Sequence, residues 1–231
     1  MTSEAGPNII YNGLVLYLDA ANPRSYPGTG TAWNNLSGSS INFTSVGSLT
    51  YNSVDFTNFT ESTNYFEISN LAHTSSLPIG SSDRTILALC KTPTAYASLG
   101  YSHIFHYGEA VLDKSFGVAM IGNQLGTHPW IGSPVSTSTI PTNTNVFLGV
   151  SYTQSTSLHR FFLNGNELSS SNATRAINTG TTTARVGSRI STAQEAWQTS
   201  GRISCIMVYN RVLSAAEILQ NYNALKGRYG L

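Results

Sequence analysis

The stretch GRISCIMVYNRVLSAAEI, residues 201–218, contains the clearest boundary between two kinds of secondary structure in this sequence. Its first half is an apolar run typical of a buried strand, and this run stops at Asn210 and Arg211. Ser214 and Glu217 then have the spacing of a capping box, in which each side chain bonds the backbone amide of the other residue. The stretch therefore predicts a strand that leads directly into a helix.

The expected helix runs from Ala215 to about Lys226, with Gly227 as its C-terminal stop. Apolar residues recur at helical spacing along it, namely Ile218, Leu219, Tyr222 and Leu225. This stripe must cover a sheet or an opening between two sheets.

Most of the remaining chain has the patterns of strands and turns. Short apolar or alternating runs are separated by Gly, Ser, Asn and Pro, which is typical of a sandwich or a barrel. Asn164-Gly165, within HRFFLNGNEL, suits a type I′ hairpin turn. We expect one all-β domain over residues 8–231, preceded by a short mobile tail at residues 1–7.

The composition excludes several function classes. Charged residues are only 10% of the 231 residues and the formal net charge is +1, with no run of Lys or Arg, so we expect no nucleic-acid partner. No apolar run is long enough for membrane insertion. The N-terminus lacks the features of a secretory signal, so release by lysis inside a virus particle is one expected route out of the cell.

In their order along the chain, these motifs resemble the laminin-G-like domains of the concanavalin A-like lectin/glucanase superfamily. The resemblance rests on GLVLYLDAANPRSYPGTGTAWNNLSG at 13–38, NYFEIS, RTILALCKT, NVFLGVSYTQSTSLHRFFLNGNEL, ARVGS and the closing stretch. The opening segment is similar to domains of tailed-phage and other virion proteins. The resemblance implies a jelly-roll sandwich of two antiparallel sheets with one short C-terminal helix.

The resemblance also raises the question of catalysis. Glucanases of this fold carry carboxylates in an E-x-D-x-E pattern, because alternate strand residues share one face. None of the eleven acidic residues follows this spacing, so we predict no enzyme activity and no catalytic residue. His103 and His106 lie three apart on a predicted strand. Strand alternation places them on opposite faces, so we do not expect them to share a metal.

Glycan binding is a common property of the family, and it requires aromatic and amide groups on loops. Tyr101, Trp130 and Trp197 lie in turn-rich segments, with His128 and Gln198 close by in sequence. These five residues are the predicted glycan-binding candidates. The alternative is that the two tryptophans only pack loops against the core.

The family resemblance further implies a calcium site in some members, and Asp19 is the candidate here. Ser204 stands where relatives often carry an acid, which counts against such a site. We favour a structural Asp19 that caps the following turn, and we expect no other cofactor.

The closing strand departs from its relatives at Cys205 and Met207. With Ile206 and Val208 facing the core, these two side chains should point outward. Relatives carry polar residues there, so an apolar outward row predicts a surface covered by a loop or by another subunit. We take Cys205 and Met207 as a candidate assembly face.

Taken together, the sequence predicts a structural, non-enzymatic component of a phage virion, either capsid-decorating or tail-associated. Its expected partners are other virion proteins, further copies of itself and cell-surface glycans. The first alternative is a carbohydrate-binding lectin or adhesin module of a virus or bacterium, working outside the cell. The second, with less support, is a glycan-active hydrolase.

Overall fold

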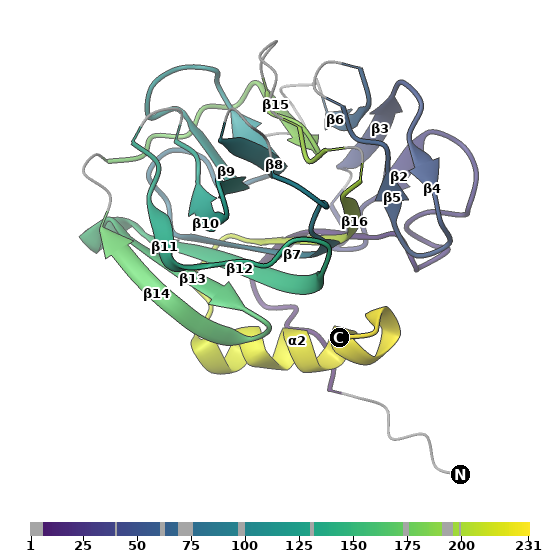
Figure 1. The fold of residues 1–231 in the computed structure, drawn as a ribbon. Coiled ribbons are helices and arrows are strands. Elements are labelled where there is room, and N and C mark those ends of the chain that lie inside the picture. Colours follow the sequence, from purple (N-terminus) through teal and green to yellow (C-terminus); the bar gives the residue numbers. More distant parts are fainter. Residues whose placement is uncertain are drawn as a thin grey trace.

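The computed structural model describes residues 7–39, 41–60, 63–68, 76–96, 100–129, 132–172, 176–190, 196–198 and 200–231. Within these residues, two eight-stranded antiparallel sheets pack face to face and one α-helix lies outside them (Figure 1). The predicted sandwich is thus confirmed. The predicted tail, residues 1–7, lies outside the described residues except for Pro7.

The first sheet, here called sheet A, carries the closing strand near its middle. Its order is β14 (Asn166–Asn172), β13 (Leu158–Leu163), β12 (Asn145–Thr153), β7 (Arg84–Lys91), β16 (Arg202–Tyr209), β5 (Phe56–Thr57) and β4 (Thr50–Tyr51), and β1 (Leu14–Asp19) also pairs with β16. A 3-10 turn, Gln154–Thr156, links β12 to β13.

The second sheet, sheet B, covers the inner face of sheet A. Its order is β11 (Val135–Thr139), β10 (Gln124–Thr127), β9 (Ser115–Ile121), β8 (Tyr101–Gly108), β15 (Thr183–Val186), β6 (Tyr65–Ile68), β3 (Asn42–Val46) and β2 (Ala32–Asn34). The main core lies between the sheets. Ile206 and Val208 of β16 point into it, as strand alternation predicts.

The β13–β14 hairpin confirms the prediction for Asn164-Gly165. Both residues have positive φ, 50° and 81°, as a type I′ turn requires, and Leu163 pairs with Asn166 across it. A side chain at position 165 would also lie 2.8 Å from a methyl carbon of Leu219. The glycine therefore serves the turn and also lets the C-terminal helix approach it.

The helix, α2, spans Ala215–Tyr229, and the capping box of Ser214 and Glu217 is formed as predicted. Its end differs from the prediction, because the left-handed residue that terminates it is Gly230 and not Gly227. Gly227 is exposed and has open space around it. A glycine there weakens the helix slightly but does not end it, since the following turn is anchored by tertiary contacts.

The buried face of α2 lies across the outer face of sheet A (Figure 1). Beneath it is a second hydrophobic cluster, separate from the main core. Its members are Ile9, Leu14, Tyr17, Leu87, Leu89, Phe147, Phe162, Cys205, Met207, Tyr209, Leu213, Ile218, Leu225 and Tyr229. Leu219, assigned to the covering stripe from the sequence, is instead 40% exposed. None of the described helices is long and apolar enough to cross a membrane.

This second cluster corrects the predicted assembly face. Cys205 and Met207 do point away from the main core, but both are 0% exposed because α2 and the N-terminal segment cover them. Their apolar character is explained by packing within the chain. Cys90 lies in the main core on the opposite face of the same sheet, and both cysteines are free thiols.

Candidate functional site

The five predicted glycan-binding residues do not form one exposed platform. Trp197 is fully buried, and its indole nitrogen donates a hydrogen bond to the carbonyl of Arg202, so it packs a loop on the core. His128 is also buried. Gln198 is half-buried beside Trp197, and Trp130 lies outside the described residues. Tyr101 and His128 do meet, with ring centroids 4.8 Å apart.

An open groove lies elsewhere, where the N-terminal segment, the segment after β1 and the end of α2 meet. It consists of two adjoining pockets of about 240 and 290 Å³ that share Tyr11, Tyr17 and Asn22. Arg24 and Leu36 complete the first pocket. The second is completed by Pro7, Asn8, Ile9, Ala224, Leu225 and Arg228. Tyr11 is 67% exposed, the largest value among the exposed large hydrophobic residues that the structure describes.

The groove is close to a buried carboxylate, that of Asp19. Four donors surround it: the Tyr17 hydroxyl at 2.7 Å, the Ala21 amide at 3.1 Å, the Arg228 guanidinium at 2.6 Å and the Tyr229 hydroxyl at 2.5 Å. Burial raises the pKa of Tyr17 and of Tyr229, so both hydroxyls stay protonated and donate. A carboxylate surrounded by donors supports the structural interpretation of Asp19 over the calcium one.

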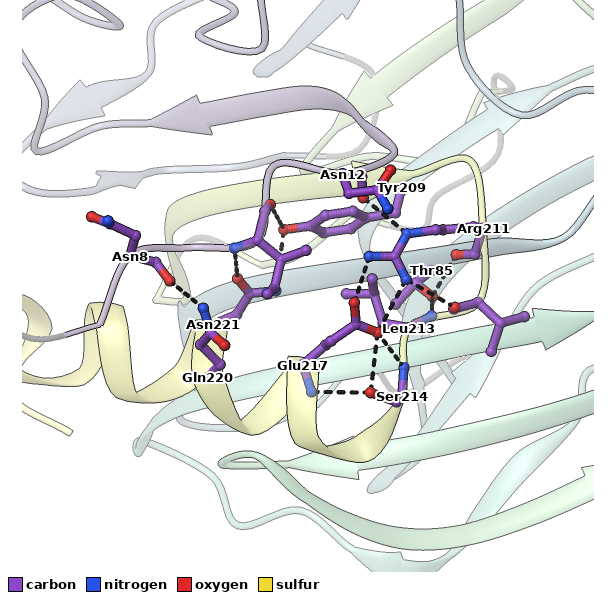
Figure 2. A network of polar contacts seen from close by, with 12 residues as sticks. Asn8, Asn12, Thr85, Tyr209, Arg211, Leu213, Ser214, Glu217, Gln220 and Asn221 are labelled. Carbon is purple, nitrogen blue, oxygen red and sulfur yellow. Dashed lines mark hydrogen bonds and ion pairs between the residues drawn. The ribbon is translucent and has the colours of Figure 1, made fainter.

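The wall of the groove is the segment from Asn8 to Asn12, which is bound to α2 through its backbone (Figure 2). The Gln220 side chain donates to the carbonyl of Asn8 at 2.8 Å. The buried side-chain oxygen of Asn221 accepts from the amide of Ile10 at 2.8 Å. The Tyr209 hydroxyl, which accepts a bond from the Asn221 amide, donates to the carbonyl of Ile10.

A second set of contacts binds the segment beyond Tyr11 (Figure 2). Arg211 donates to the carbonyl of Asn12 at 2.9 Å and forms a two-point ion pair with Glu217 of the capping box, at 2.6 and 3.0 Å. This pairing lowers the pKa of Glu217 to about 2. The backbone of Tyr11 is therefore held between two bonded neighbours before any ligand arrives, which lowers the entropy cost of binding at this position.

The groove combines groups suited to a polar, partly flat ligand. Tyr11 offers an exposed ring face, and Asn22 an amide. Arg24 and Arg228 contribute two guanidinium groups; that of Arg228 is 40% exposed although it pairs with Asp19. Aromatic rings can stack against the apolar face of a ligand, and guanidinium groups can form paired hydrogen bonds with a carboxylate.

A separate polar cluster is buried on sheet B and contains three histidines. Nε2 of His103 lies 2.7 Å from Nδ1 of His128. Nε2 of His106 donates to the carbonyl of His128 at 3.2 Å, and its Nδ1 accepts from the amide of Ile190 at 3.3 Å. One ring nitrogen from each of the three residues lies within 4.8 Å of the others.

The cluster corrects the prediction that His103 and His106 face opposite surfaces. A β-bulge in β8 lets the step from His103 to Phe105 match the single step from Ala119 to Val118 on β9. His103 and His106 then oppose Ala119 and Gly117, which are two apart and share a face. The rings of His103 and His106 are 5.0 Å apart. Strand alternation gave the wrong faces because the extra residue in the bulge shifts all later side chains of β8 to the opposite face.

Burial lowers the pKa of His106 well below its ordinary value, with further lowering from nearby His128, Arg189 and Arg185. Its imidazole is therefore neutral at neutral pH, in agreement with the donor and acceptor roles of its two nitrogens. The three-residue spacing of His103 and His106 was the signal in the sequence. The bulge that places these two histidines on the same face was not indicated by any pattern in the sequence.

Comparison with solved structures shows that the fold recurs in proteins of different function. The Trypanosoma rangeli sialidase in complex with sialic acid matches 93% of this chain and 33% of its own, with a TM-score of 0.65 and 14% identity. The binding domain of botulinum neurotoxin DC, in complex with rat synaptotagmin II, matches 94% and 52%, with a TM-score of 0.67 and 13% identity.

A third structure, of botulinum neurotoxin type C, comes from work on cell entry that depends on two ganglioside molecules. It matches 94% of this chain and 52% of its own, with a TM-score of 0.67 and 13% identity. The chain thus spans about a third of the sialidase and about half of the toxin chains. At such identities the likeness shows the fold alone. No curated protein matches the sequence.

These structures correct the prediction that the chain is not an enzyme. That prediction took the missing glucanase carboxylates as grounds for exclusion. A sialidase and a variant with trans-sialidase activity contain the same fold at 12–14% identity, so the absence of one carboxylate pattern does not exclude enzymes of this fold.

The family assignment comes from the sequence. The profile of the concanavalin A-like lectin/glucanases superfamily matches residues 72–219, which is more than half of the chain and includes the closing strand and the start of α2. The two antiparallel sheets agree with this match. The chain belongs to the concanavalin A-like lectin/glucanases superfamily.

Proposed function

We propose that this chain is a carbohydrate-binding domain and that it binds an acidic glycan in the groove lined by Tyr11, Asn22, Arg24 and Arg228. The observation that carries the proposal is the exposed Tyr11 ring, which follows a bonded backbone and lines the same groove as two guanidinium groups. The lectin fold of the chain supports a carbohydrate as its ligand. Two structures with the same fold are a sialidase in complex with sialic acid and a neurotoxin whose cell entry depends on two ganglioside molecules.

The chemistry of the groove fits a sugar with a carboxylate. The flat C–H face of a sugar ring can pack on the ring of Tyr11. The backbone of Tyr11 is already bonded on both sides, so it loses little conformational entropy when a ligand binds. A guanidinium group binds a carboxylate through two parallel hydrogen bonds, which a lysine cannot reproduce. Arg24 is exposed and is the better placed of the two arginines to pair with such a group.

The proposal is tested by titrating the protein with sialic acid and with galactose, and following the amide signals by NMR. We expect saturable shifts near Tyr11 and Asn22 with the acidic sugar and much weaker binding of the neutral one. Tyr11→Ala and Arg24→Gln should each weaken binding by about tenfold, equivalent to roughly 1.4 kcal/mol. Leu219→Ala, a change at another exposed apolar residue outside the groove, is the matched control.

Equal effects of the control and the groove variants would show that the groove is not the binding site. Equal binding of both sugars would remove the role assigned to the arginines. Absence of shifts with a wider panel of acidic glycans would contradict carbohydrate binding in the groove altogether.

A second candidate function is a structural role in a phage particle, at the capsid or the tail. The observation that favours it is the resemblance of the opening segment, residues 13–38, to segments of virion proteins. A carbohydrate-binding domain within a virion protein would unite both functions, with other virion proteins as partners. Mass spectrometry of purified particles tests it, and absence of the chain from the particles would contradict it.

A further inference from the structure

We propose that His103, His106 and His128 form a binding site for one divalent transition-metal ion of the Zn²⁺ class. The site is separate from the proposed glycan groove, since it lies on sheet B and the groove lies at the end of α2. The proposal does not depend on carbohydrate binding.

The three imidazoles are already gathered at close to ligand distance. One nitrogen from each lies within 4.8 Å of the other two, whereas nitrogens around a tetrahedral zinc are roughly 3.3 Å apart, given Zn–N bonds of about 2.0–2.1 Å. Small ring rotations close this difference. His103 and His128 already share a hydrogen bond at 2.7 Å, and a metal ion between them would take the place of its proton.

His106, the third histidine, could bind a metal through one ring nitrogen and keep a hydrogen bond at the other. Two hydrogen bonds of His106, to the carbonyl of His128 at 3.2 Å and from the amide of Ile190 at 3.3 Å, are longer than the usual hydrogen bond of about 2.9–3.0 Å. Nδ1 of His106 can therefore coordinate a metal at the loss of the long bond from Ile190, while Nε2 keeps its proton and its bond to the carbonyl of His128. The other bond would then orient the ring, as outer contacts do in metal sites.

The sheet makes room for these rings with small residues. A Cβ atom at position 117 would lie 2.6 Å from the Cδ2 atom of His106 and 2.5 Å from the carbonyl oxygen of Phe105. Glycine at 117 and alanine at 119, opposite His106 and His103, thus permit three imidazoles in a space that larger residues would fill. Burial of three polar rings is unfavourable unless their nitrogens find partners.

The ligand set selects the class of metal. Imidazole nitrogen suits Zn²⁺, Cu²⁺, Ni²⁺ and Co²⁺, whereas Ca²⁺ and Mg²⁺ require oxygen ligands. Three histidines leave a fourth position for water. Arg185, opposite His106 on β15, is paired with Glu67 at 2.5 Å. Arg189 also contributes positive charge at His106, so we expect weaker binding than at a closed four-ligand site.

The experiment uses the full chain, first freed of metal with a chelator and then titrated with Zn²⁺ by calorimetry. We expect one equivalent to bind, and Co²⁺ at the same site to give the visible absorption of tetrahedral cobalt. His103→Phe and His106→Phe should each weaken binding by about 100-fold or more, because loss of a direct ligand exceeds the 10–100-fold typical of outer contacts. His159→Phe, at a buried histidine outside the cluster, is the matched control.

A second measurement covers the case in which a cluster variant does not fold. In the unaltered protein, labelled imidazole nitrogens followed by NMR should shift on addition of Zn²⁺ for three of the five histidines. Absence of these shifts, or of bound metal, would overturn the proposal. Retention of wild-type affinity in the two cluster variants, or equal loss in the His159 variant, would also overturn it.

Discussion

At the scale of single residues, buried polar side chains hold together the two ends of the described chain. Asn221 is fully buried in α2, yet its amide accepts from Ile10 and donates to Tyr209. The Asp19 carboxylate similarly joins β1 to the last turn of the helix through Arg228 and Tyr229. A buried polar group without its partner costs about 1–3 kcal/mol, so these few bonds keep the walls of the groove in place.

His159 leads to a prediction on pH dependence. Its Nδ1 lies 3.0 Å from the Thr127 hydroxyl, and burial lowers the pKa of its imidazole to about 4. The unfolded chain, with a histidine pKa of about 6.5, takes up the proton first as pH falls. The stability that a neutral His159 contributes is therefore lost as pH falls from about 6.5 towards 4.

We expect His159→Phe to remove this sensitivity. Between pH 7 and 4.5, the free energy of unfolding should fall by about 2–3 kcal/mol less in the variant than in the unaltered protein, since one pKa unit corresponds to about 1.4 kcal/mol. Urea unfolding at both pH values measures the difference. Because all other groups are common to both proteins, an identical fall would contradict the assignment.

At the scale of elements, α2 is an integral layer of the structure and not an appendage. Its capping box sets where it begins, and the Glu217 that completes this box also binds Arg211 in the preceding loop. Its buried face covers the apolar outer row of β16. Cys205 and Met207 can therefore be apolar, where relatives carry polar residues, because α2 covers them.

Two leucines in α2 offer a matched test of this interpretation. Leu225 is 2% exposed within the outer cluster, and Leu219 is 40% exposed. Leu225→Asp should lower the melting temperature strongly or prevent folding, because it buries an unpaired charge. Leu219→Asp should change the free energy of unfolding by no more than about 0.5 kcal/mol. Thermal unfolding followed by circular dichroism compares the two, and similar effects would mean that α2 does not cover the sheet as described.

At the scale of the whole molecule, sheet A is buried on both faces over much of its area. The main core lies on one face and the cluster under α2 on the other. Cys90 and Cys205 lie on these opposite faces, and burial raises the pKa of both thiols. A thiol that is buried and protonated reacts slowly, since the thiolate is the reactive form.

We therefore expect both thiols to be unreactive until the molecule unfolds. At pH 8, the reaction of the native protein with an aromatic disulfide should release less than 0.2 equivalents of the coloured aromatic thiolate, on the order of a tenth of the two thiols. In guanidinium, the unfolded protein should release two equivalents. A reductant should leave the melting temperature unchanged, because no disulfide joins the two faces. An increase of the melting temperature on oxidation, or rapid reaction of the thiols in the native protein, would contradict the placement of Cys90 and Cys205 in two separate buried clusters.

The sequence by itself determined the features that depend on near neighbours. The capping box at Ser214, the Asn164-Gly165 turn and the inward direction of Ile206 and Val208 were all predictable, because each depends on residues a few positions apart. The order of these motifs also identified the family and the sandwich. What the sequence could not determine was which surface covers another.

Only the tertiary structure decided three matters. It placed α2 over Cys205 and Met207, it introduced the bulge that brings His103 and His106 together, and it joined Tyr11, Arg24 and Arg228 in one groove. The physical reason is the same in each case. A bulge depends on pairing with the neighbouring strand. Covered faces and grooves depend on packing between segments that can be 212 positions apart, and local periodicity carries no information on such contacts.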